Sequence, residues 1–347
     1  MNTTVTQTMA AAVFDGPGRL AITDRPVPTC NTLGDVLIEV EACGVCGTDL
    51  LILSDPPRHP ATTGVILGHE FVGHVREVND GAPGLSVGDR VVVDPDFSCG
   101  TCSACRHGLR EQCTEFNPIG IFRDGGLASY VAVPARACFA VSNSLSAERA
   151  SMAEPLSCVC YGLHSLKPSL GESAVIVGAG PIGLLFCAVL QLAGVGPIVA
   201  VEPVAARRET ATRMGASTAL DPTDPDLEKR IREQLGGDGP NIVVDAVGSQ
   251  LALALRLAGV GARILLFGIN DASLAKVRQV DITRRELLVL GAGDGQHLFP
   301  ESIRLLEDDR LDLSSMVSHV VALPDLPIAL DEITAGKARK VIVDIRR

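Results

Sequence analysis

The residues from Ser173 to Val201 carry no charged side chain. Glycines and prolines interrupt this stretch, so it does not offer the continuous apolar helix that a membrane span requires. Its apolar runs fit a strand, a glycine turn, a buried helix and a second strand, because parallel strands covered on both faces need continuous apolar residues. The stretch therefore predicts a parallel sheet between helices rather than a membrane protein.

A G-x-G-x-x-G pattern marks the turn inside this stretch. Such glycines permit a tight turn, let the backbone approach a pyrophosphate and allow close packing of the next helix, whose N-terminus then faces the phosphates. The pattern stands between a predicted strand and a predicted helix, which is the context that a dinucleotide site requires. The predicted turn consists of Gly178, Gly180, Pro181, Ile182 and Gly183.

Glu202 follows the next predicted strand, near the offset at which an acidic residue accepts hydrogen bonds from the adenine ribose. A carboxylate there repels a 2′-phosphate and favours NAD over NADP. Arg207 and Arg208 argue for NADP, because a nearby arginine can bind that phosphate. Alternatively, Glu202 is a solvated residue at the end of a strand with no role in binding the cofactor.

Strands and helices alternate from about Tyr161 onward, as in a doubly wound parallel sheet. The residues before Tyr161 form short strands separated by glycine and proline turns, which predicts a β-rich barrel or sandwich. The predicted strands are 35–40, 71–78, 91–93, 174–177, 198–201, 241–245, 263–267, 287–290 and 340–344, and the predicted helices are 182–193, 204–214 and 300–306.

Four cysteines, Cys99, Cys102, Cys105 and Cys113, have the spacing C-x2-C-x2-C-x7-C. Closely spaced thiolates on a tight loop can converge on one tetrahedral ion, and all-sulfur coordination suits structural zinc. An iron–sulfur cluster is the competing interpretation, but its bacterial pattern ends in C-x3-C-P, which is absent here. Unpaired loop cysteines are the third possibility. We assign this predicted site no catalytic role.

A second, dispersed set of metal-ligand residues combines Cys46, His69, Glu70 and Glu154. Each residue alone is a weak signal, since a histidine before a glutamate is more often structural than ligating. Together they offer a thiolate, an imidazole and two carboxylates, and catalytic zinc uses about three protein ligands with one open position.

The net charge of −11 and the absence of a basic stripe argue against a nucleic-acid partner. The N-terminal residues have no positive charge before their short apolar run and do not read as a secretory signal. The 11 cysteines are odd in number, and metal ligation is a better first hypothesis for the clustered ones than disulfides. We therefore expect a cytoplasmic protein with no membrane partner.

In chain order, Gly44-Val45-Cys46-Gly47-Thr48-Asp49, Gly68-His69-Glu70, the four cysteines, Glu154-Pro155-Leu156-Ser157-Cys158 and the glycine pattern resemble the zinc-containing medium-chain dehydrogenases/reductases. The polyol (sorbitol-like) and threonine dehydrogenase branches are the most similar. The resemblance spans Ala11 to Asp344. It implies a GroES-like β-rich catalytic domain at 1–157, a Rossmann domain at 158–296 and a C-terminal return to the catalytic domain at 297–347.

The resemblance also implies roles for individual residues. Cys46 and His69 would be ligands of a catalytic zinc, Glu70 and Glu154 exchangeable or water-bridged carboxylates at the same ion, and Asp49 a residue that orients a ligand. The choice between Glu70 and Glu154 is open. Thr48 would begin the proton relay. The nicotinamide side would be lined by Val247, Phe267, Gly268, Gly291, Ala292 and Gly293, and Lys340 would contact the pyrophosphate.

The chain departs from the family at Leu51, where relatives often have a histidine in the proton relay. Glu70, water or His59 are the substitutes, and His59 fits an ordinary surface loop residue as well. An arginine near Arg207 also occurs in NAD-dependent relatives, beside the adenine, so NAD remains the expected cofactor.

The sequence thus predicts an NAD-dependent zinc alcohol dehydrogenase with two zinc ions per subunit, catalytic and structural. The predicted substrate is a small secondary alcohol, or the corresponding ketone, of polyol, cyclitol or sugar-derived type. The alternatives are an amino-alcohol dehydrogenase of the threonine type and a catalytically silent dinucleotide-binding scaffold. Relatives form homodimers or homotetramers, and we expect one of these states.

Overall fold

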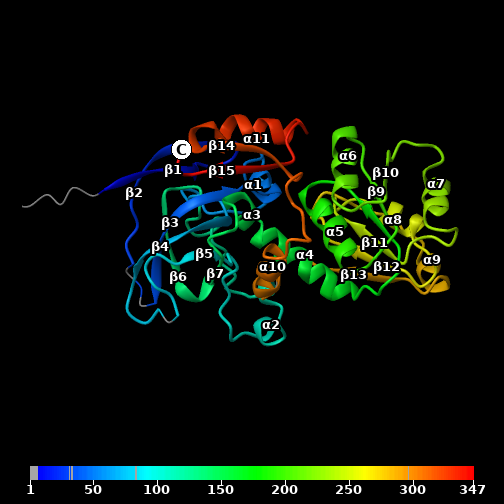
Figure 1. The fold of residues 1–347 in the computed structure, drawn as a ribbon, viewed down its shortest axis with the longest axis horizontal. Coiled ribbons are helices and arrows are strands. Elements are labelled where there is room, and N and C mark those ends of the chain that lie inside the picture. The colour runs from blue at the N-terminus through cyan, green and yellow to red at the C-terminus, as the bar shows by residue number, and fades with distance from the viewer. Residues whose placement is uncertain (1–6, 31, 33, 83, 296) are drawn as a thin grey trace, which may run out of the picture. The chain divides into compact units, whose positions relative to one another are not determined.

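In the computed structural model the described residues are 7–30, 32, 34–82, 84–295 and 297–347. The chain divides into two compact units, and Figure 1 labels their elements. Unit 1 comprises Met1–Glu154, Phe299–Glu307 and Val317–Arg347, and unit 2 comprises Pro155–Leu298 and Asp308–Met316. The predicted domain limit at Gln296 and the first six residues of the N-terminal segment lie outside the described residues.

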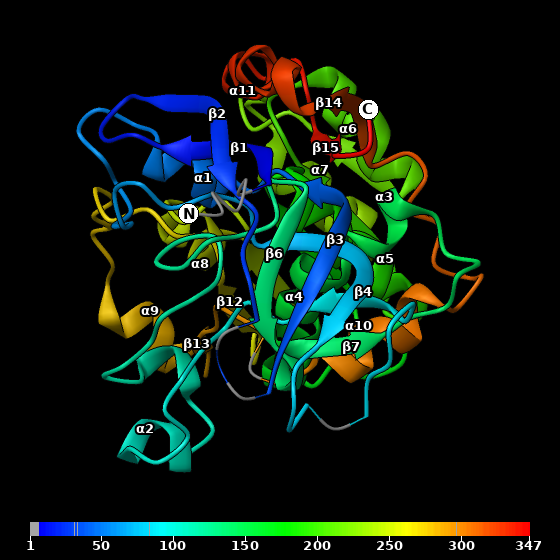
Figure 2. The ribbon, with the colours of Figure 1, turned by 90° about the vertical axis from the view of Figure 1, so that its left-hand side faces the viewer.

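Unit 1 is built on an antiparallel-rich sheet with the strand order β14-β15-β3-β4-β5-β7, with β6 paired to β3 and a separate β1–β2 pair. Figure 2 looks onto strands β3, β4 and β6. The strands are β1 (Thr8–Phe14), β2 (Leu20–Pro26), β3 (Asp35–Gly44), β4 (Glu70–Val78), β5 (Arg90–Val93), β6 (Tyr130–Pro134), β7 (Cys138–Ala140), β14 (Val317–Ala322) and β15 (Lys340–Asp344).

The helices of unit 1 are short and stand at the ends of strands or in connections. They are α1 (Gly47–Ile52), α2 (Ser103–Arg106), η1 (Arg110–Gln112), η2 (Ala135–Ala137), α3 (Ala147–Ala150), α10 (Phe299–Leu306), η3 (Leu323–Asp325) and α11 (Leu326–Thr334). Helix α4 (Ala153–Leu166) begins at the end of the first segment of unit 1.

The register of β3 brings three distant segments of unit 1 together. Gly44, the last residue of β3, pairs with Glu70 in β4 and with Ile342 in β15. Cys46 follows two residues after Gly44, and His69 directly precedes β4. The first residue of β15 is Lys340. The sheet therefore gathers the predicted metal ligands at one end of β3.

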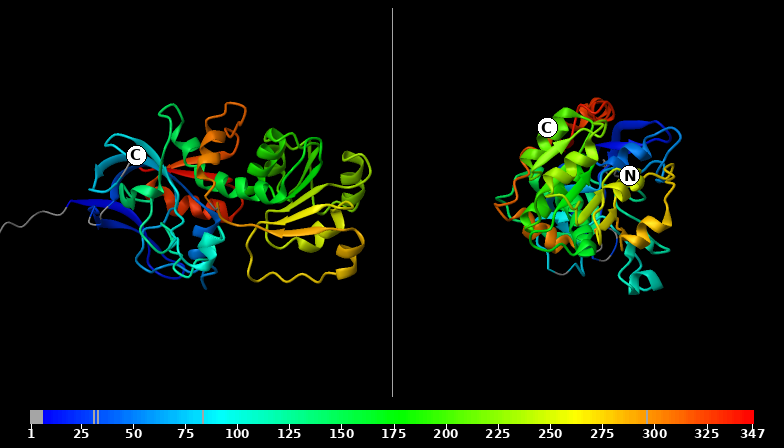
Figure 3. Two further views of the ribbon diagram at one scale, coloured as in Figure 1. Left: turned by 90° about the horizontal axis from the view of Figure 1, so that it is seen from below. Right: turned by 90° about the vertical axis from the view of Figure 1, so that its right-hand side faces the viewer.

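Unit 2 is a six-stranded parallel sheet with the order β10-β9-β8-β11-β12-β13. Its strands are β8 (Ala174–Val177), β9 (Ile198–Val201), β10 (Thr218–Leu220), β11 (Ile242–Asp245), β12 (Arg263–Leu266) and β13 (Leu288–Gly291), and its helices are α5 (Pro181–Leu192), α6 (Ala205–Arg213), α7 (Leu227–Gln234), α8 (Leu251–Leu257) and α9 (Gln279–Arg284). Helices α5 and α6 pack together, as do α7 and α8, on the two sides of this sheet (Figure 3).

The predicted α/β fold is confirmed, as are the predicted strands and helices, whose ends shift by a few residues. Strands β8, β9 and β15 have the predicted bounds, and β3 extends four residues beyond the predicted Val40. Gly291 was predicted in a turn, but it is the last residue of β13, where it pairs with Leu266. No helix among the described residues is both long and apolar enough to cross a membrane.

Each unit has an aliphatic core, as expected for a chain with no Trp. The four residues of β8 are all buried, which agrees with the continuous apolar run that predicted it. Phe186 of α5 is fully buried and meets Phe267 edge to face, with 5.1 Å between ring centroids. The cores hold the end of β3, near the predicted metal ligands, and the end of β8, next to the predicted glycine turn.

Candidate metal centre and dinucleotide turn

Cys46 stands at the N-cap of α1, immediately beyond the end of β3. Its sulfur accepts a hydrogen bond from the backbone N–H of Thr48 at 3.5 Å, and the Asp49 carboxylate accepts from the backbone N–H of Cys46 at 2.9 Å. This reciprocal pair is a capping box, which satisfies two N–H groups that the start of a helix leaves free. The local sequence therefore fixes where the thiol points.

The ligand atoms of Cys46, His69 and Glu70 lie within 4.8 Å of one another. The structure thus brings together three of the four residues of the dispersed set. A sulfur, an imidazole nitrogen and a carboxylate oxygen make a donor set that zinc accepts in catalytic sites.

Two buried polar atoms in this cluster lack a hydrogen-bond partner among the described residues. They are Nδ1 of His69 and Oδ1 of Asp49, which lie 3.9 Å apart. A buried polar atom without a partner costs about 1–3 kcal/mol. A metal-ligating histidine usually donates its other ring N–H to a carboxylate, and Asp49 is the carboxylate placed to receive it. The residues present therefore fit a zinc ion.

The charges around His69 favour its protonated form when no metal is considered. Burial lowers the pKa of His69, but the Cys46 sulfur, Asp49 and Glu154 raise it, and the net pKa lies well above its usual value. The centre thus attracts positive charge to the place where the predicted zinc would lie.

Lys340 supplies a positive charge to the same cluster. Its side chain is 1% exposed, and its ammonium donates to the Val45 carbonyl at 3.0 Å and to the Glu70 carboxylate. Burial lowers the pKa of Lys340, but the charge of Glu70 raises it, and the net pKa is above its usual value. A side chain at Gly44 would overlap Glu70 Oε2 and lie 3.2 Å from Lys340 Nζ, so only glycine leaves room for this ion pair. A pyrophosphate contact for Lys340 stays a prediction.

The remaining candidates are Glu154, Thr48 and the two relay positions, Leu51 and His59. Glu154, the second residue of α4, raises the pKa values of His69 and Lys340 through its charge, yet it is not among the three groups that converge. The hydroxyl of Thr48 lies 3.6 Å from the Cys46 sulfur. Leu51 is half-buried on α1, and the ring of His59 bonds the Pro60 carbonyl at 2.8 Å.

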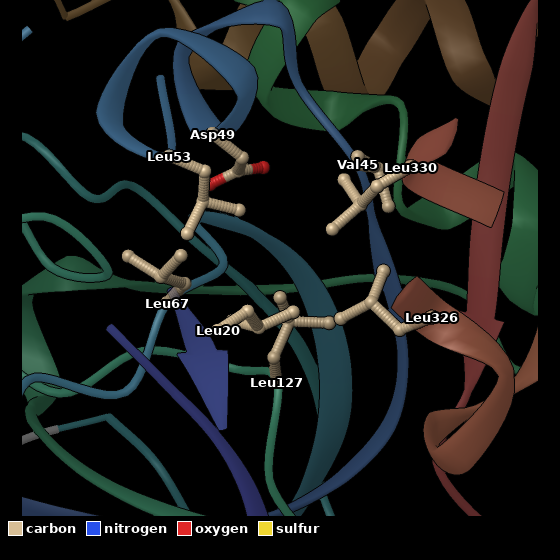
Figure 4. Close-up of a pocket in the computed structure, with 8 residues that line it drawn as sticks. All are labelled: Leu20, Val45, Asp49, Leu53, Leu67, Leu127, Leu326 and Leu330. Atoms are coloured by element: carbon tan, nitrogen blue, oxygen red, sulfur yellow. The ribbon is translucent and has the colours of Figure 1, made fainter. Parts of the chain in front are cut away.

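Asp49 also lines a small apolar pocket (Figure 4). Burial raises the pKa of Asp49, with His69 and the Cys46 N–H acting in the opposite direction. The apolar walls explain why the free carboxylate oxygen finds no donor. They consist of Leu20, Val45, Leu53, Leu67, Leu127, Leu326 and Leu330.

The four cysteines of the predicted structural zinc site converge as well, with their sulfurs within 4.8 Å of one another. Backbone N–H groups point at these sulfurs: Thr101 and Cys102 donate to Cys99 at 3.4 and 3.3 Å. Hydrogen bonds from Thr101 and Cys102 lower the pKa of Cys99 to about 6. Because the thiolate is the form that binds metal, these hydrogen bonds favour the metal-binding form of Cys99.

Arg110 ties the four-cysteine loop to the strand that precedes it. It bonds both oxygens of Asp94, at 2.6 and 2.9 Å, and one oxygen of Asp96 at 3.1 Å. The Arg110 side chain is 5% exposed. Burial raises the pKa of Asp96 to about 6, although Arg110 acts to lower it. Sequence analysis missed Arg110, because an arginine between two cysteines gives no signal of its own.

In unit 2 the glycine turn has the geometry that its sequence predicts. Gly178 has φ +93°, a conformation that side chains rarely adopt, and a Cβ there would lie 2.6 Å from Val247. A Cβ at Gly183 would overlap the Gly178 carbonyl oxygen, while one at Gly180, the N-cap of α5, would meet nothing within 4 Å. Gly180 is therefore the glycine that leaves space for a ligand, and the other two shape the turn.

Glu202 is buried beside this turn. Its carboxylate accepts from the Ala179 N–H at 2.8 Å and from the Val204 N–H at 3.0 Å. Arg208 binds the Glu202 and Pro203 carbonyls and Asp221. The buried Nε of Arg207 has no hydrogen-bond partner among the described residues. Glu202 thus holds the turn in place, and Arg208 is already engaged.

The residues predicted for the nicotinamide side follow β11, β12 and β13. Val247 is 44% exposed, Phe267 is buried, and Gly268 packs so closely on Val247 and Gly248 that a side chain would overlap their backbone. Ala292 and Gly293 follow the end of β13. Sequence analysis missed Asp245, whose carboxylate accepts the N–H groups of Val247, Gly248 and Gln250. An aspartate that ends an apolar strand before a glycine could have indicated it.

Together, a GroES-like unit with two candidate metal centres and a Rossmann unit define a zinc-type dehydrogenase. Two family models match the chain: "Alcohol dehydrogenase GroES-like domain" at residues 32–143 and "Zinc-binding dehydrogenase" at residues 181–308. Among curated relatives, the erythritol/L-threitol dehydrogenase of Mycolicibacterium smegmatis is 30% identical and the match covers 97% of each chain. The L-threonine 3-dehydrogenase of Pyrococcus abyssi is 33% identical over 89% of this chain and 90% of its own.

Solved structures agree with this assignment. A zinc-binding dehydrogenase from Sinorhizobium meliloti bound to NADP has a TM-score of 0.92 and 30% identity, covering 97% of this chain and 99% of its own. An alcohol dehydrogenase from E. coli CFT073 with NADH has a TM-score of 0.90 and 28% identity, with the same coverage. The chain belongs to the zinc-binding alcohol dehydrogenases of the medium-chain dehydrogenase/reductase family, which are oxidoreductases acting on CH–OH groups.

Replacing Arg110 tests the buried ion pairs of the four-cysteine loop. We expect Arg110→Ala to lower the free energy of unfolding of unit 1 by about 3–5 kcal/mol, because it leaves two buried carboxylates without their partner. The chain has two tyrosines and no tryptophan, so Tyr130 fluorescence in a Tyr161→Phe background reports urea unfolding of unit 1 alone. Exposed Arg106 in the same loop gives the control, Arg106→Ala. If Arg110→Ala and Arg106→Ala were equally stable, the buried ion pairs of Arg110 would not stabilise unit 1.

Proposed function

We propose that the chain is a zinc-dependent oxidoreductase that transfers hydride between a secondary alcohol and NAD. The convergence of Cys46, His69 and Glu70 around buried, unpartnered polar atoms is the observation that carries the proposal. The proposed substrate is a polyol, cyclitol or sugar-derived alcohol, supported by similarity to an erythritol/L-threitol dehydrogenase. Threonine or another amino alcohol is the second candidate, supported by an equally similar L-threonine 3-dehydrogenase.

A zinc ion bound by Cys46, His69 and a carboxylate would act as a Lewis acid that lowers the pKa of an alcohol hydroxyl. The residues of the chain have separate tasks around it. Asp49, whose Oδ1 lies 3.9 Å from Nδ1 of His69, would orient the ring of the metal-bound histidine, and Lys340 holds one oxygen of Glu70 and neutralises its charge. Because Lys340 engages Glu70 Oε2, Glu154 remains a second candidate for the carboxylate ligand.

Thr48 is the residue proposed to receive the alcohol proton. Its hydroxyl lies beside the Cys46 sulfur, so it is close to the group that would bind the metal. Leu51 has no ionisable group, so the proton passes from Thr48 to water rather than to an imidazole at that position. The four cysteines of the loop would hold a second, structural zinc.

Replacing Cys46 tests the catalytic zinc. We expect wild-type protein to hold close to two zinc ions per chain and Cys46→Ala close to one. Turnover should fall by more than about 100-fold, since even partners of metal ligands cost 10–100-fold when removed. Dinucleotide binding should persist, because the glycine turn belongs to unit 2.

Elemental analysis and NADH absorbance with a panel of polyols and amino alcohols measure these effects. The variant Cys43→Ala, which removes a buried thiol outside the converging set, is the matched control. Full activity in Cys46→Ala would refute the proposal that Cys46 is a ligand of the catalytic zinc. A wild-type protein with one zinc, confined to the four cysteines, and no turnover would favour the silent scaffold.

NAD is the proposed cofactor, and Glu202 is the residue proposed to select it. A buried carboxylate beside the turn disfavours a 2′-phosphate, and Arg208 is engaged by carbonyls and by Asp221. We expect Glu202→Gln to reduce the ratio of kcat/KM for NAD to that for NADP by about tenfold, or 1.4 kcal/mol. Initial rates with both cofactors measure the ratio, and exposed Glu209→Gln on α6 is the control. Preference for NADP in the wild type would contradict the proposal.

We propose that the chain forms a homodimer or homotetramer through the edge of the unit 2 sheet. Strand β13 ends the strand order, and Leu288 and Val289 on it are 55% and 38% exposed. An apolar edge strand offers unpaired N–H and C=O groups to a second strand. Sedimentation should find an oligomer that Leu288→Lys converts to smaller species, while Val260→Lys, at a position 77% exposed, leaves it intact. A monomeric wild type would refute the interface.

A further inference from the structure

Two arginines meet at one aromatic ring in unit 1. The guanidinium carbon of Arg123 lies 4.8 Å from the centre of the Phe97 ring, and that of Arg136 lies 4.5 Å from the same centre. Arg123 comes from the turn after Ile119, and Arg136 comes from η2. The fold therefore brings two positive charges from separate segments to the same aromatic ring.

Neither guanidinium has a hydrogen bond or an ion pair with any residue that the structure describes. The acidic neighbours in sequence are engaged elsewhere: Asp96 is bound by Arg110 at 3.1 Å, and Asp124 accepts the Ile66 N–H at 2.9 Å. In a chain with a net charge of −11, two arginines thus lie over one ring without a described carboxylate partner.

The ring that carries the two arginines is held firmly. The Phe97 carbonyl accepts the Asn117 N–H at 2.9 Å, and its side chain packs against the core of unit 1. The Asp94 N–H bonds the Ala137 carbonyl at 2.8 Å, which fixes η2 beside the strand leading to Phe97. A guanidinium stacked on an aromatic ring keeps its N–H donors in its own plane, where they remain available to a ligand.

We propose that Arg123 and Arg136, arranged on Phe97, form a binding site for an oxyanion of the phosphate or carboxylate type. Guanidinium groups bind both anions through paired N–H donors, and this geometry is the one that favours arginine over lysine at such sites. The anion neutralises two charges that the described residues of the chain leave unpaired.

The backbone turn that carries Arg123 lies next to the backbone of His69. The Gly120 N–H donates to the Arg123 carbonyl at 2.7 Å, and a Cβ at Gly120 would lie 2.9 Å from the backbone nitrogen of His69. The turn that carries Arg123 is therefore packed on the backbone of a proposed metal ligand. The anion is either the charged end of the alcohol substrate, which rests on the proposed function, or a free ion bound beside it.

Phosphate titration of the zinc-loaded, full-length protein tests the site. NAD is kept saturating so that the glycine turn of unit 2 is occupied, and chloride holds the ionic strength constant. Calorimetry should find saturable binding of inorganic phosphate to the wild type. We expect Arg123→Gln and Arg136→Gln each to weaken it by about tenfold or more, as for a lost charged hydrogen bond, and Arg136→Lys to weaken it less.

Arg106→Gln is the matched control, because it removes the same charge from an exposed arginine of unit 1 that contacts no ring. Its phosphate affinity should stay within about twofold of the wild type, since surface charges away from a site have small effects. Tyr130 fluorescence in the Tyr161→Phe background verifies that each variant is folded.

Three results would overturn the proposal. The first is no saturable phosphate binding in the wild type, and the second is an equal loss in Arg106→Gln, which would indicate net charge alone. The third is binding that survives in the double variant Arg123→Gln/Arg136→Gln but disappears in Cys46→Ala, because the anion would then lie on the metal.

Inhibition kinetics with a neutral alcohol distinguish the two sources of the anion. Phosphate that competes with the alcohol supports a substrate that carries its own phosphate or carboxylate group. Phosphate that binds without competing supports a free ion at the same arginines. If no alcohol is oxidised at all, the proposed function fails, while the titration still determines whether the oxyanion site exists.

Discussion

The buried ion pair of Lys340 with Glu70 is the contact on which unit 1 depends most. It lies among Cys46, Asp49 and Glu154, so most of the ionisable groups at this centre are acidic. Charges taken out of water are tolerated only when they are paired and hydrogen-bonded. Lys340 comes from the last strand of the chain, 270 residues from Glu70. The chain must therefore return to unit 1 after completing unit 2, and Gly44 must lack a side chain to admit the pair.

Buried charges are also paired at the four-cysteine loop, where the cation is Arg110 instead of Lys340. Arg110 pairs with Asp94 and Asp96 at the base of the loop, so the loop is attached by buried charge as well as by whatever its sulfurs bind. Phe97 lies between these carboxylates and Cys99, which places the two stacked arginines next to a rigid anchor. The buried arginine of this segment, Arg110, is thus paired with carboxylates, whereas the two arginines on Phe97 have no described carboxylate partner.

Local patterns could be predicted from the sequence, and long-range pairs could not. The strand at Ala174–Val177, the glycine turn and the cysteine spacing each depend on residues a few positions apart, so their geometry follows from the order of the side chains. The contacts of Lys340 and Arg110 depend on the register between distant strands, which no short pattern encodes. Strand β14 escaped prediction because all six residues are half-buried and show no alternation. Glu202 was predicted from its offset, but its bond to the Ala179 N–H required the folded turn.

The two units prepare their sites in opposite ways. In unit 2 the site is made by missing side chains: Gly180 leaves space, and Glu202 and Asp245 already satisfy the backbone around it. In unit 1 the site keeps polar atoms of His69 and Asp49 that no described residue satisfies. A cation that binds there relieves a cost that folding has already incurred, so its binding free energy adds to the stability of unit 1. A dinucleotide finds a turn that is complete without it. Metal binding should therefore be coupled to the folding of unit 1 more strongly than dinucleotide binding is coupled to that of unit 2.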